Sequence, residues 1–392
     1  MSQLKDLIVL ELASVLAGPG VGQFFAELGA EVIKVENLRT TGDVTRSWKS
    51  RDENADDRSA YFCAVNWGKQ SIALDISTGE GRDIVHRLAE RAQIVISSFK
   101  PGDAEKLGVD YVTLSQINPA LIYGQITGYG SNNTRVGYDA IIQAEAGFMS
   151  MNGEPGRQSL KMPVALMDIL AGHHLKEGLL LAMLEKTTTG RGKLVETSLI
   201  QAAVSSLANQ ASNFLVAGKL PGKQGSAHPN IAPYGDVFVT ADNQEVILAI
   251  GTDRQFTQLS KLLKINNISQ ESAFENNVLR VRNRTQLNQV LGAAIEKYPA
   301  AQLLEMLHQE KIPAGLVRNV SEVLEQSEVQ EILMENQGMR GVRSFVAHTS
   351  DSLLSHLTPP PHFGEHTSQV LARMLNFSPT DIESLQLKGV VK

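Results

Sequence analysis

Residues 7–36 of the chain read LIVLELASVLAGPGVGQFFAELGAEVIKVE. Residues 7–12 are almost entirely apolar, which is typical of a strand buried on both faces of a parallel sheet. A glycine-rich turn leads into a helical pattern over residues 21–28, and Gly29 is suited to end that helix in the left-handed conformation. Residues 31–36 predict a second strand. The stretch therefore predicts a βαβ unit, in which the two strands lie parallel and the helix covers one face.

Strand-like runs and helical patterns continue to alternate after this unit. This alternation predicts an α/β fold with a doubly wound, mostly parallel sheet. The expected strands are residues 71–75, 93–97, 121–126 and 193–197, and the expected helices are residues 79–91 and 169–186, with a further helix up to residue 217.

A change of composition marks the end of this large domain. Residues 218–233 are rich in Gly, Pro and Lys and are typical of a linker. Residues 235–240 and 245–250 then predict the two strands of a hairpin. The expected organisation is a large domain over residues 1–224 and a smaller α+β domain over residues 225–325.

The composition of the 392 residues, with 42% hydrophobic and 20% charged residues, is that of a soluble globular enzyme. The net charge of -6 argues against a nucleic-acid partner, since binding to phosphates requires clustered Lys and Arg. Cys63 is the one cysteine, so an intrachain disulfide and a multi-cysteine metal site are excluded. His173 and His174 lack a third ligand at suitable spacing, so no metal is expected.

The start of the chain lacks the pattern of a signal peptide. The apolar stretch at residues 179–184 is flanked by charged residues and is too short to span a membrane. A cytoplasmic location without membrane association is expected.

The glycine turn invites a different interpretation, a dinucleotide-binding dehydrogenase. In that motif glycines let the backbone approach a pyrophosphate, and a later acidic residue, here Glu36, binds a ribose. Gly18 and Gly20 fit the first two glycine positions, but Gln23 occupies the third, and Pro19 lies inside the turn. The turn is then a tight link between strand and helix, which is compatible with other ligands.

A series of short segments, in a fixed order along most of the chain, forms a second pattern. They are residues 16–19 (LAGP), 28–36 (LGAEVIKVE), 42–46 (GDVTR), 69–75 (KQSIALD), 99–102 (FKPG), 118–123 (NPALIY), 128–130 (GYG), 137–139 (GYD), Asp168, 189–192 (TGRG), 312–315 (IPAG) and 364–367 (GEHT). Their order and spacing resemble the family III CoA-transferases, also called the CaiB/BaiF family. That family includes formyl-CoA:oxalate and carnitine CoA-transferases.

The resemblance implies transfer of CoA from an acyl-CoA to a free small carboxylic acid. Coenzyme A and acyl-CoA are then substrates, with no permanently bound cofactor and no metal. The resemblance also implies a Rossmann-like large domain that binds CoA, and an interlocked homodimer of two chains threaded through each other. The large domain of such a chain takes both ends, so residues 326–392 are expected to return to it.

Asp168 matches the position of the nucleophile in that family. A carboxylate can attack a thioester carbonyl to give a mixed anhydride, and the released thiolate then leaves CoA on the enzyme as an aspartyl thioester. Asp168 also precedes the helix expected from residue 169, and Asp is a favoured N-cap residue. From the residues alone a helix cap is the more frequent role, and the two roles are compatible.

The resemblance also carries over a set of CoA contacts. The residues at matching positions are Leu16, Ala17, Leu74, Asp75, Ile76, Ser77, Ser98, Phe99, Gly137, Tyr138 and Asp139. The candidates for contacts with the CoA phosphates are Arg39, Lys100, Lys106 and Arg135. The family pattern has Asn at the position of Ser98 and Arg at the position of Lys106. Any one of these cations is more often a solvated surface residue.

Two alternatives stay open. An α-methylacyl-CoA racemase has the same fold and needs an acid–base pair at the acyl α-carbon. In racemases a histidine corresponds to Tyr138, and a phenol with an ordinary pKa of about 10 is a poor base at neutral pH. The other alternative is a CoA-binding homologue without catalysis, and the presence of Asp168 argues against it.

Overall fold

The computed structural model describes residues 4–53, 56–265, 267–347 and 357–392. By its internal contacts the chain forms two compact units. The first unit comprises Met1–Ala146, Met162–Leu207 and Glu331–Lys392, and the second comprises Gly147–Lys161 and Ala208–Gln330. The expected domain boundaries at residues 224 and 325 stay a prediction.

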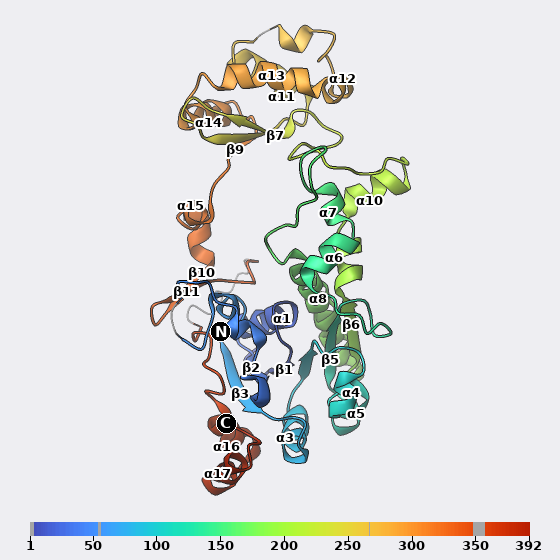
Figure 1. Cartoon of the computed structure of the whole chain (residues 1–392), viewed down its shortest axis with the longest axis vertical. Helices are drawn as coiled ribbons and strands as arrows, with labels where there is room; N and C mark the ends of the chain where they lie inside the picture. The colour runs from blue at the N-terminus through green and yellow to red at the C-terminus, as the bar shows by residue number, and fades with distance from the viewer. Residues whose placement is uncertain (1–3, 54–55, 266, 348–356) are drawn as a thin grey trace. The chain divides into compact units, whose positions relative to one another are not determined.

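The first unit contains a sheet of six parallel strands in the order β3-β2-β1-β4-β5-β6 (Figure 1). The strands are β1 (Ile8–Leu12), β2 (Glu31–Asn37), β3 (Lys69–Leu74), β4 (Ile94–Ser97), β5 (Ile122–Thr127) and β6 (Leu194–Ser198). The expected α/β fold with a parallel sheet is confirmed, and this strand order is that of a Rossmann fold. The order reverses between β1 and β4, and such sheets bind ligands at the carboxyl ends of the strands beside the reversal.

Helices of the first unit pack around this sheet. They are α1 (Ala17–Glu27), α2 (Ala60–Cys63), α3 (Gly79–Ala89), α4 (Asp103–Leu107), α5 (Tyr111–Ile117), α6 (Asp139–Glu145), α8 (Leu166–Thr189), α9 (Leu199–Ser205), α16 (Thr367–Leu375) and α17 (Pro379–Leu387). Leu371 of α16 and Leu385 of α17 lie in one apolar core with Leu10 of β1. The end of the chain also contacts the sheet directly, since Asp75 N donates a hydrogen bond to Val390 O at 2.8 Å.

Two helices of the first unit begin earlier than the sequence predicts. Helix α1 starts at Ala17 instead of residue 21, because Pro19 is tolerated in the first turn of a helix. Helix α8 starts at Leu166 instead of residue 169. The two helices pack against each other, and a Cβ added at Gly172 would lie 3.3 Å from the carbonyl oxygen of Ala17. The beginning of α8 therefore lies against the beginning of α1.

The second unit has its own small sheet and core. Strands β7 (Tyr234–Val239) and β8 (Glu245–Ala249) pair antiparallel, which confirms the expected hairpin, and β9 (Ala314–Leu316) pairs with β8. Leu248, Phe256 and Leu291 lie in the apolar core of this unit. Its helices are α7 (Phe148–Met151), α10 (Ala208–Leu215), α11 (Asp253–Leu262), α12 (Asn277–Arg282), α13 (Arg284–Ile295), α14 (Ala300–Gln309) and α15 (Val320–Leu324). A further hairpin, β10 (Leu333–Asn336) and β11 (Met339–Val342), belongs to the first unit.

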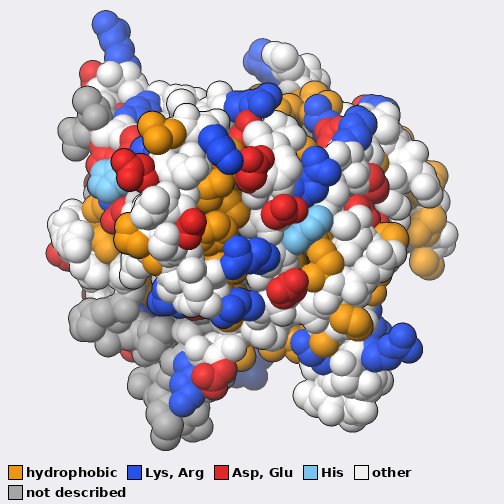
Figure 2. Space-filling view, turned by 90° about the horizontal axis from the view of Figure 1, so that it is seen from below, with side chains coloured by type: hydrophobic (Ala, Val, Ile, Leu, Met, Phe, Trp, Pro, Cys, Tyr) orange, Lys and Arg blue, Asp and Glu red, His pale blue; other side chains and the backbone are white. Residues whose placement is uncertain are grey.

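Charges of both signs are mixed on the face of the molecule that Figure 2 shows. Figure 2 shows acidic and basic side chains interspersed, with hydrophobic side chains between them, on the face seen from below. This mixture agrees with the modest net charge of -6. None of the helices in the described part of the chain has the length and apolar character needed to cross a membrane.

Candidate active site

A cavity of about 630 Å³ lies at the carboxyl ends of β1 to β4, beside the reversal of the strand order. Part of the expected CoA-contact set lines it, namely Arg39, Asp75, Ile76, Ser77, Ser98 and Phe99. The remaining members lie outside this lining, namely Leu16, Ala17, Leu74, Lys100, Lys106, Arg135, Gly137, Tyr138 and Asp139. The structure thus brings together the expected contacts that follow strands β2, β3 and β4.

Arg39 is the expected phosphate cation that lines the cavity. Its Nε lies 2.6 Å from Asp75 Oδ2, while its side chain is 66% exposed. Asp75 also accepts hydrogen bonds from Ser77, from the backbone N at 3.0 Å and from Oγ at 2.6 Å. The Asp75 carboxylate therefore holds the guanidinium at the rim, with most of its donors still directed to solvent.

The other expected cations have surface positions. Lys100 is exposed, and the exposed Lys106 forms an ion pair of 2.9 Å with Asp103. The Arg135 guanidinium forms an ion pair with Glu145 at 2.5 Å. Lys106 and Arg135 are thus partly neutralised by neighbours on the same surface.

Buried charges lie in and behind the cavity wall, and two of them, Lys34 and Asp43, line the cavity. Lys34 Nζ lies 2.9 Å from Glu11 Oε1 and 2.9 Å from Asp43 Oδ2, and Lys69 Nζ lies 2.8 Å from Glu11 Oε2. We call Glu11, Lys34, Asp43 and Lys69 the buried charge network. Its two positive and two negative charges balance, as a low-dielectric interior requires.

The two lysines of this network differ in their carboxylate partners. Burial lowers the pKa of Lys34, but the Asp43 and Glu11 carboxylates outweigh it and raise this pKa above its usual range. Among the described residues, Glu11 is the carboxylate that pairs with Lys69, and burial lowers the pKa of Lys69 to about 8. Two carboxylates thus keep Lys34 charged, whereas Lys69 is held less firmly in its charged form.

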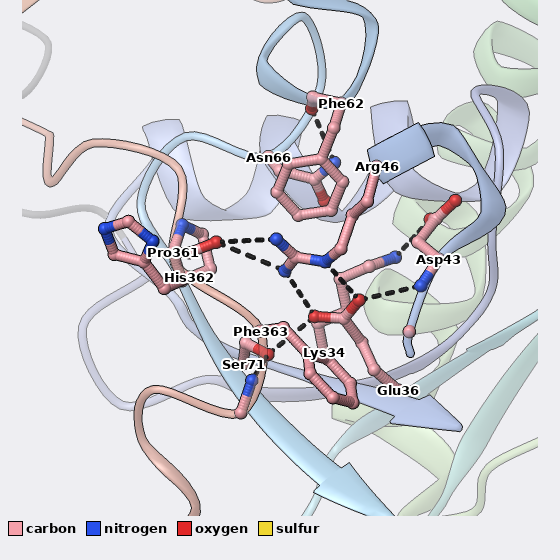
Figure 3. Close-up of polar contacts among 12 residues, drawn as sticks. Lys34, Glu36, Asp43, Arg46, Phe62, Asn66, Ser71, Pro361, His362 and Phe363 are labelled. Carbon is pink, nitrogen blue, oxygen red and sulfur yellow. Dashed lines mark hydrogen bonds and ion pairs between the residues drawn. The ribbon is translucent and has the colours of Figure 1, made fainter. Parts of the chain in front are cut away.

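Glu36 is fully engaged by neighbouring donors, as Figure 3 shows. Arg46 donates to both carboxylate oxygens, at 2.6 and 2.8 Å. Ser71 Oγ donates to Oε1 at 2.6 Å, and Asp43 N donates to Oε2 at 2.8 Å. Because Glu36 is also only 2% exposed, it is not available to bind a ribose. The occupied carboxylate argues against the dehydrogenase interpretation.

Asp168 lies in the first turn of α8 and is 8% exposed. The N-cap of this helix is Ala165, and no side chain caps it. The helix-cap interpretation of Asp168 is therefore wrong, because the helix begins at Leu166, ahead of the aspartate. Burial, and then the negative charge of Asp139, raise the pKa of Asp168 to about 7.

Asp139 joins the beginning of α6 to the beginning of α8. Its Oδ1 accepts a hydrogen bond from Met167 N at 2.9 Å, and its Oδ2 accepts one from Gln143 Nε2 at 2.8 Å. Within the described part of the chain, no hydrogen bond reaches the Asp168 carboxylate. Asp139 therefore has hydrogen-bond donors on both oxygens and adds negative charge beside Asp168, which receives no hydrogen bond from the described residues.

The turn before α6 depends on two glycines. A Cβ added at Gly137 would lie 2.4 Å from Gly128 Cα, so the two backbones are in direct contact. Tyr138 follows as the N-cap residue of α6, and its side chain is 56% exposed. The close approach fixes where Asp139 enters the helix, while the phenol of Tyr138 points largely into solvent.

Comparison with known proteins decides the family. The model of the family described as CoA-transferase family III matches residues 4–367. The chain belongs to the CoA-transferase family III. It is an enzyme of the CaiB/BaiF type, and acyl-CoA thioesters are the substrates of such transferases.

Similar proteins cover nearly the whole chain. A succinate–glutarate CoA-transferase of Agrobacterium fabrum is 38% identical over 385 residues, which are 95% of each chain. A succinyl-CoA:glutarate CoA-transferase of Mus musculus is 32% identical over 401 residues, covering 100% of this chain and 91% of that one. The crystal structure of a CaiB/BaiF family protein from Brucella suis has a TM-score of 0.83 at 38% identity, covering 94% of this chain and 98% of that one.

Sequence reasoning about this CoA-transferase missed Tyr61, a half-buried residue of α2. Burial, and then the charges of Asp168 and Asp139, raise the pKa of Tyr61 to about 12. The phenol is therefore protonated at neutral pH and lies within electrostatic reach of Asp168. Its ring packs edge-to-face against Trp48, with 5.1 Å between ring centroids. No pattern in the sequence marks Tyr61, because four-residue α2 is too short to show periodicity.

One group among the described residues has the spacing of metal ligands, namely Asp56, Asp57 and His362. These side chains already pair within the group and nearby, since His362 Nδ1 lies 2.5 Å from Asp57 Oδ1 and Arg58 lies 2.5 Å from Asp56 Oδ2. None of these residues is in the lining of the 630 Å³ cavity.

Proposed function

We propose that this CoA-transferase moves CoA from an acyl-CoA to a free carboxylic acid, with Asp168 as the nucleophile. The proposal rests on the environment of Asp168. Its carboxylate is buried, lies near the like charge of Asp139, and receives no hydrogen bond within the described residues. A poorly solvated carboxylate without partners is a better nucleophile once ionised than one held by hydrogen bonds.

The covalent steps balance without ATP. The ionised Asp168 attacks the thioester carbonyl of the acyl-CoA, which forms a mixed anhydride and releases the CoA thiolate. The thiolate then attacks the aspartyl carbonyl, releasing the first acid and leaving an aspartyl-CoA thioester. A second acid repeats these steps in reverse, so that its own CoA thioester leaves and the Asp168 carboxylate is restored.

The helix geometry supports this chemistry. Asp168 lies in the first turn of α8, where the helix dipole stabilises negative charge on a carboxylate or a developing oxyanion. The beginning of α1 lies against α8 at Gly172. The cavity at the strand ends, with Arg39 at its rim, is the proposed site for the nucleotide part of CoA.

Short dicarboxylic acids are the proposed acyl groups and acceptors. The relatives from Agrobacterium fabrum and Mus musculus are named for succinate, succinyl-CoA and glutarate, and one from Chloroflexus aurantiacus is named for succinyl-CoA and D-citramalate. The cytoplasm is the proposed location.

Mass spectrometry tests the intermediate. After incubation with succinyl-CoA, the peptide that contains Asp168 should gain the mass of CoA minus water, and added glutarate should remove it. The matched control is Asp168→Asn, which keeps the size of the side chain and should stay unlabelled. Transfer between succinyl-CoA and glutarate without this adduct would contradict the proposal, and so would an adduct on another residue. A chain that neither labels nor transfers would be a CoA-binding homologue without catalysis.

An interlocked homodimer is the proposed assembly. Large apolar side chains are exposed in each unit, with Leu181 and Leu184 of α8 at 66% and 67% and Val216 and Leu220 of the second unit at 87% and 81%. Association would remove such side chains from water. We expect sedimentation to give the dimer mass down to nanomolar concentrations, because linked chains cannot separate while folded. A folded monomer after dilution would contradict this assembly.

A further inference from the structure

The turn between β1 and α1 contains a backbone conformation that valine rarely adopts. Val15 has a φ of 73°, in the left-handed region where a β-branched side chain clashes with its own backbone. The residues just before it, Ala13 and Ser14, line the cavity. Such a conformation persists only where the surrounding structure holds it.

Lys34 and Asp43 hold this turn from two sides. Lys34 Nζ donates a hydrogen bond to Ala13 O at 2.8 Å. Val15 N donates to the Asp43 carboxylate, at 3.3 Å from each oxygen. The two side chains also pair with each other at 2.9 Å, as the dashed contacts in Figure 3 show. The carbonyl of Ala13, the ammonium, the carboxylate and the amide of Val15 thus form a ring that closes through the backbone of residues 13–15.

The other half of the buried charge network supports the start of α1. Lys69 Nζ donates to Pro19 O at 2.8 Å. The Glu11 carboxylate lies directly under the helix, since a Cβ added at Gly22 would be 1.9 Å from its Oε2. The network therefore contacts the turn at its first residues and the helix in its first two turns.

Buried ion pairs seldom stabilise a fold more than apolar side chains of the same volume would, because both ions lose their hydration. Apolar side chains, however, could not bind the carbonyl of Ala13 and the amide of Val15. We propose that Lys34 and Asp43 are positioning residues that hold Val15 in its left-handed conformation and so preset the turn beside the cavity for acyl-CoA. This inference rests on the proposed function for the identity of the ligand.

Asp43→Asn tests the role. An amide directs its oxygen either toward Val15 and Thr45 or toward Lys34, and its NH₂ group then faces a donor on the other side. We expect hydrogen exchange of the amides in residues 13–17 to become about tenfold faster. The KM for succinyl-CoA should rise about tenfold, with kcat changed by less than about threefold.

Val15→Gly in the Asp43→Asn background separates positioning from general stability. Glycine adopts a positive φ without strain, so the turn no longer needs to be held. The double variant should recover a KM within about threefold of the unmodified chain, whereas a merely structural defect would not respond to residue 15.

The chain offers a matched control in Asp110→Asn. Asp110 accepts hydrogen bonds from Thr113 N at 3.1 Å and Oγ1 at 2.6 Å, as Asp43 does from Thr45 N at 3.1 Å and Oγ1 at 2.8 Å. It lies outside the cavity lining and should leave the exchange of the turn unchanged. If Asp43→Asn does not fold, Thr45→Val loosens Asp43 without removing its charge and should give smaller shifts in the same direction.

Two results would overturn the positioning role. One is a folded Asp43→Asn protein with unchanged exchange and KM, and the other is an equal defect with and without Val15→Gly. If the unmodified chain does not turn over succinyl-CoA, the proposed function fails instead. The exchange measurement then still decides whether Asp43 holds the turn.

Discussion

Two buried carboxylates of the first unit, Asp43 and Asp168, have opposite surroundings. They are similarly buried, at 4% and 8% exposure. Burial alone would raise both pKa values, yet Lys34 and the hydrogen bonds from Thr45 bring the pKa of Asp43 below its usual range. Asp168 has a like charge, Asp139, nearby instead, and its pKa is raised to about 7. Burial therefore does not decide what a carboxylate does; the charge of its neighbours does.

The difference separates a structural role from a chemical one. A carboxylate held by an ammonium and by hydrogen bonds is already stabilised and reacts poorly, but it can fix a backbone in place. A buried carboxylate without such partners is less stable in its charged form and gains more from attacking a carbonyl. Sites of this second kind commonly reduce stability in exchange for activity.

The strongest test of the comparison is removal of the Asp168 carboxylate. Asp168→Ala should lower CoA transfer about a thousandfold or more, because no nucleophile is left for the anhydride. In the unmodified chain, acceptor acid labelled with oxygen-18 in its carboxylate should transfer one labelled oxygen to Asp168. The anhydride oxygen comes from that acid and stays on Asp168 when the thiolate attacks the acyl carbonyl.

Stability should change in the opposite direction from activity. At pH 8 the folded chain contains an ionised, poorly solvated Asp168, so Asp168→Asn should raise the free energy of unfolding by about 1–4 kcal/mol. Urea unfolding at pH 8 measures this difference. A folded Asp168→Ala protein with substantial transfer, or an Asp168→Asn protein that is less stable at pH 8, would remove the basis of the comparison.

Breaking the ion pair between Lys34 and Asp43 should lower the stability of the fold. Lys34→Met leaves Asp43 as a buried carboxylate without its ammonium, and it should lower the free energy of unfolding by about 3–5 kcal/mol. Adding Asp43→Asn removes the unpaired buried charge, so the double variant should recover part of the lost free energy of unfolding. Urea unfolding of the two single variants and the double variant gives the coupling energy. Additive losses would mean that the ion pair does not act as a unit.

Local patterns were enough to predict the sheet, because buried parallel strands are nearly continuous apolar runs and the helices between them are amphipathic. They did not predict the buried charge network. Glu11 and Lys34 each interrupt an apolar strand and read as isolated charges, yet they are direct partners in the parallel pairing of β1 and β2. Opposite charges, one in each of two neighbouring apolar strands, are the signal that could have revealed this ion pair.

The family pattern predicted the position of Asp168, but it could not predict the surroundings of its carboxylate. Its pKa depends on how α6 and α8 meet, through the hydrogen bond from Met167 N to Asp139, which joins residues 28 positions apart. The conformation of Val15 is likewise held by contacts with Lys34 and Asp43, which lie in β2 and in the segment that follows it. Such features follow from tertiary packing, which no local pattern encodes.

The pH dependence of activity should be a moderate effect. With the pKa of Asp168 at about 7, kcat/KM for acyl-CoA should rise roughly tenfold between pH 6 and pH 8, as the nucleophile loses its proton. Asp139→Asn removes the neighbouring charge and should move the midpoint to lower pH. A rate profile that is flat across this range, or unmoved by Asp139→Asn, would contradict the raised pKa.

The same group sets the sign of a pH effect on stability. The folded-state pKa of Asp168 is raised from 3.8 to about 7, so the folded chain binds the proton more tightly than the unfolded chain does. The stability that the protonated Asp168 contributes is fully present below its pKa in the unfolded chain. It is lost as the pH rises through its pKa in the folded chain. Unfolding measured from pH 5 to pH 8 should therefore show a difference between the unmodified chain and Asp168→Asn that grows with pH.

The smallest expected effect concerns the α-carbon of the acyl group, where a transferase has no reason to act. A racemase needs two groups that exchange a proton at that carbon, and Tyr138, at the position of the racemase histidine, is a 56% exposed phenol. Succinyl-CoA incubated with the enzyme in D₂O should gain no α-deuterium above the uncatalysed rate. Tyr138→His should not change this, since an imidazole at an exposed helix cap is not thereby aligned with the substrate. Rapid α-deuteration without acid-dependent CoA exchange would make Asp168 one half of an acid–base pair, and its raised pKa would then serve proton transfer instead of attack on a carbonyl.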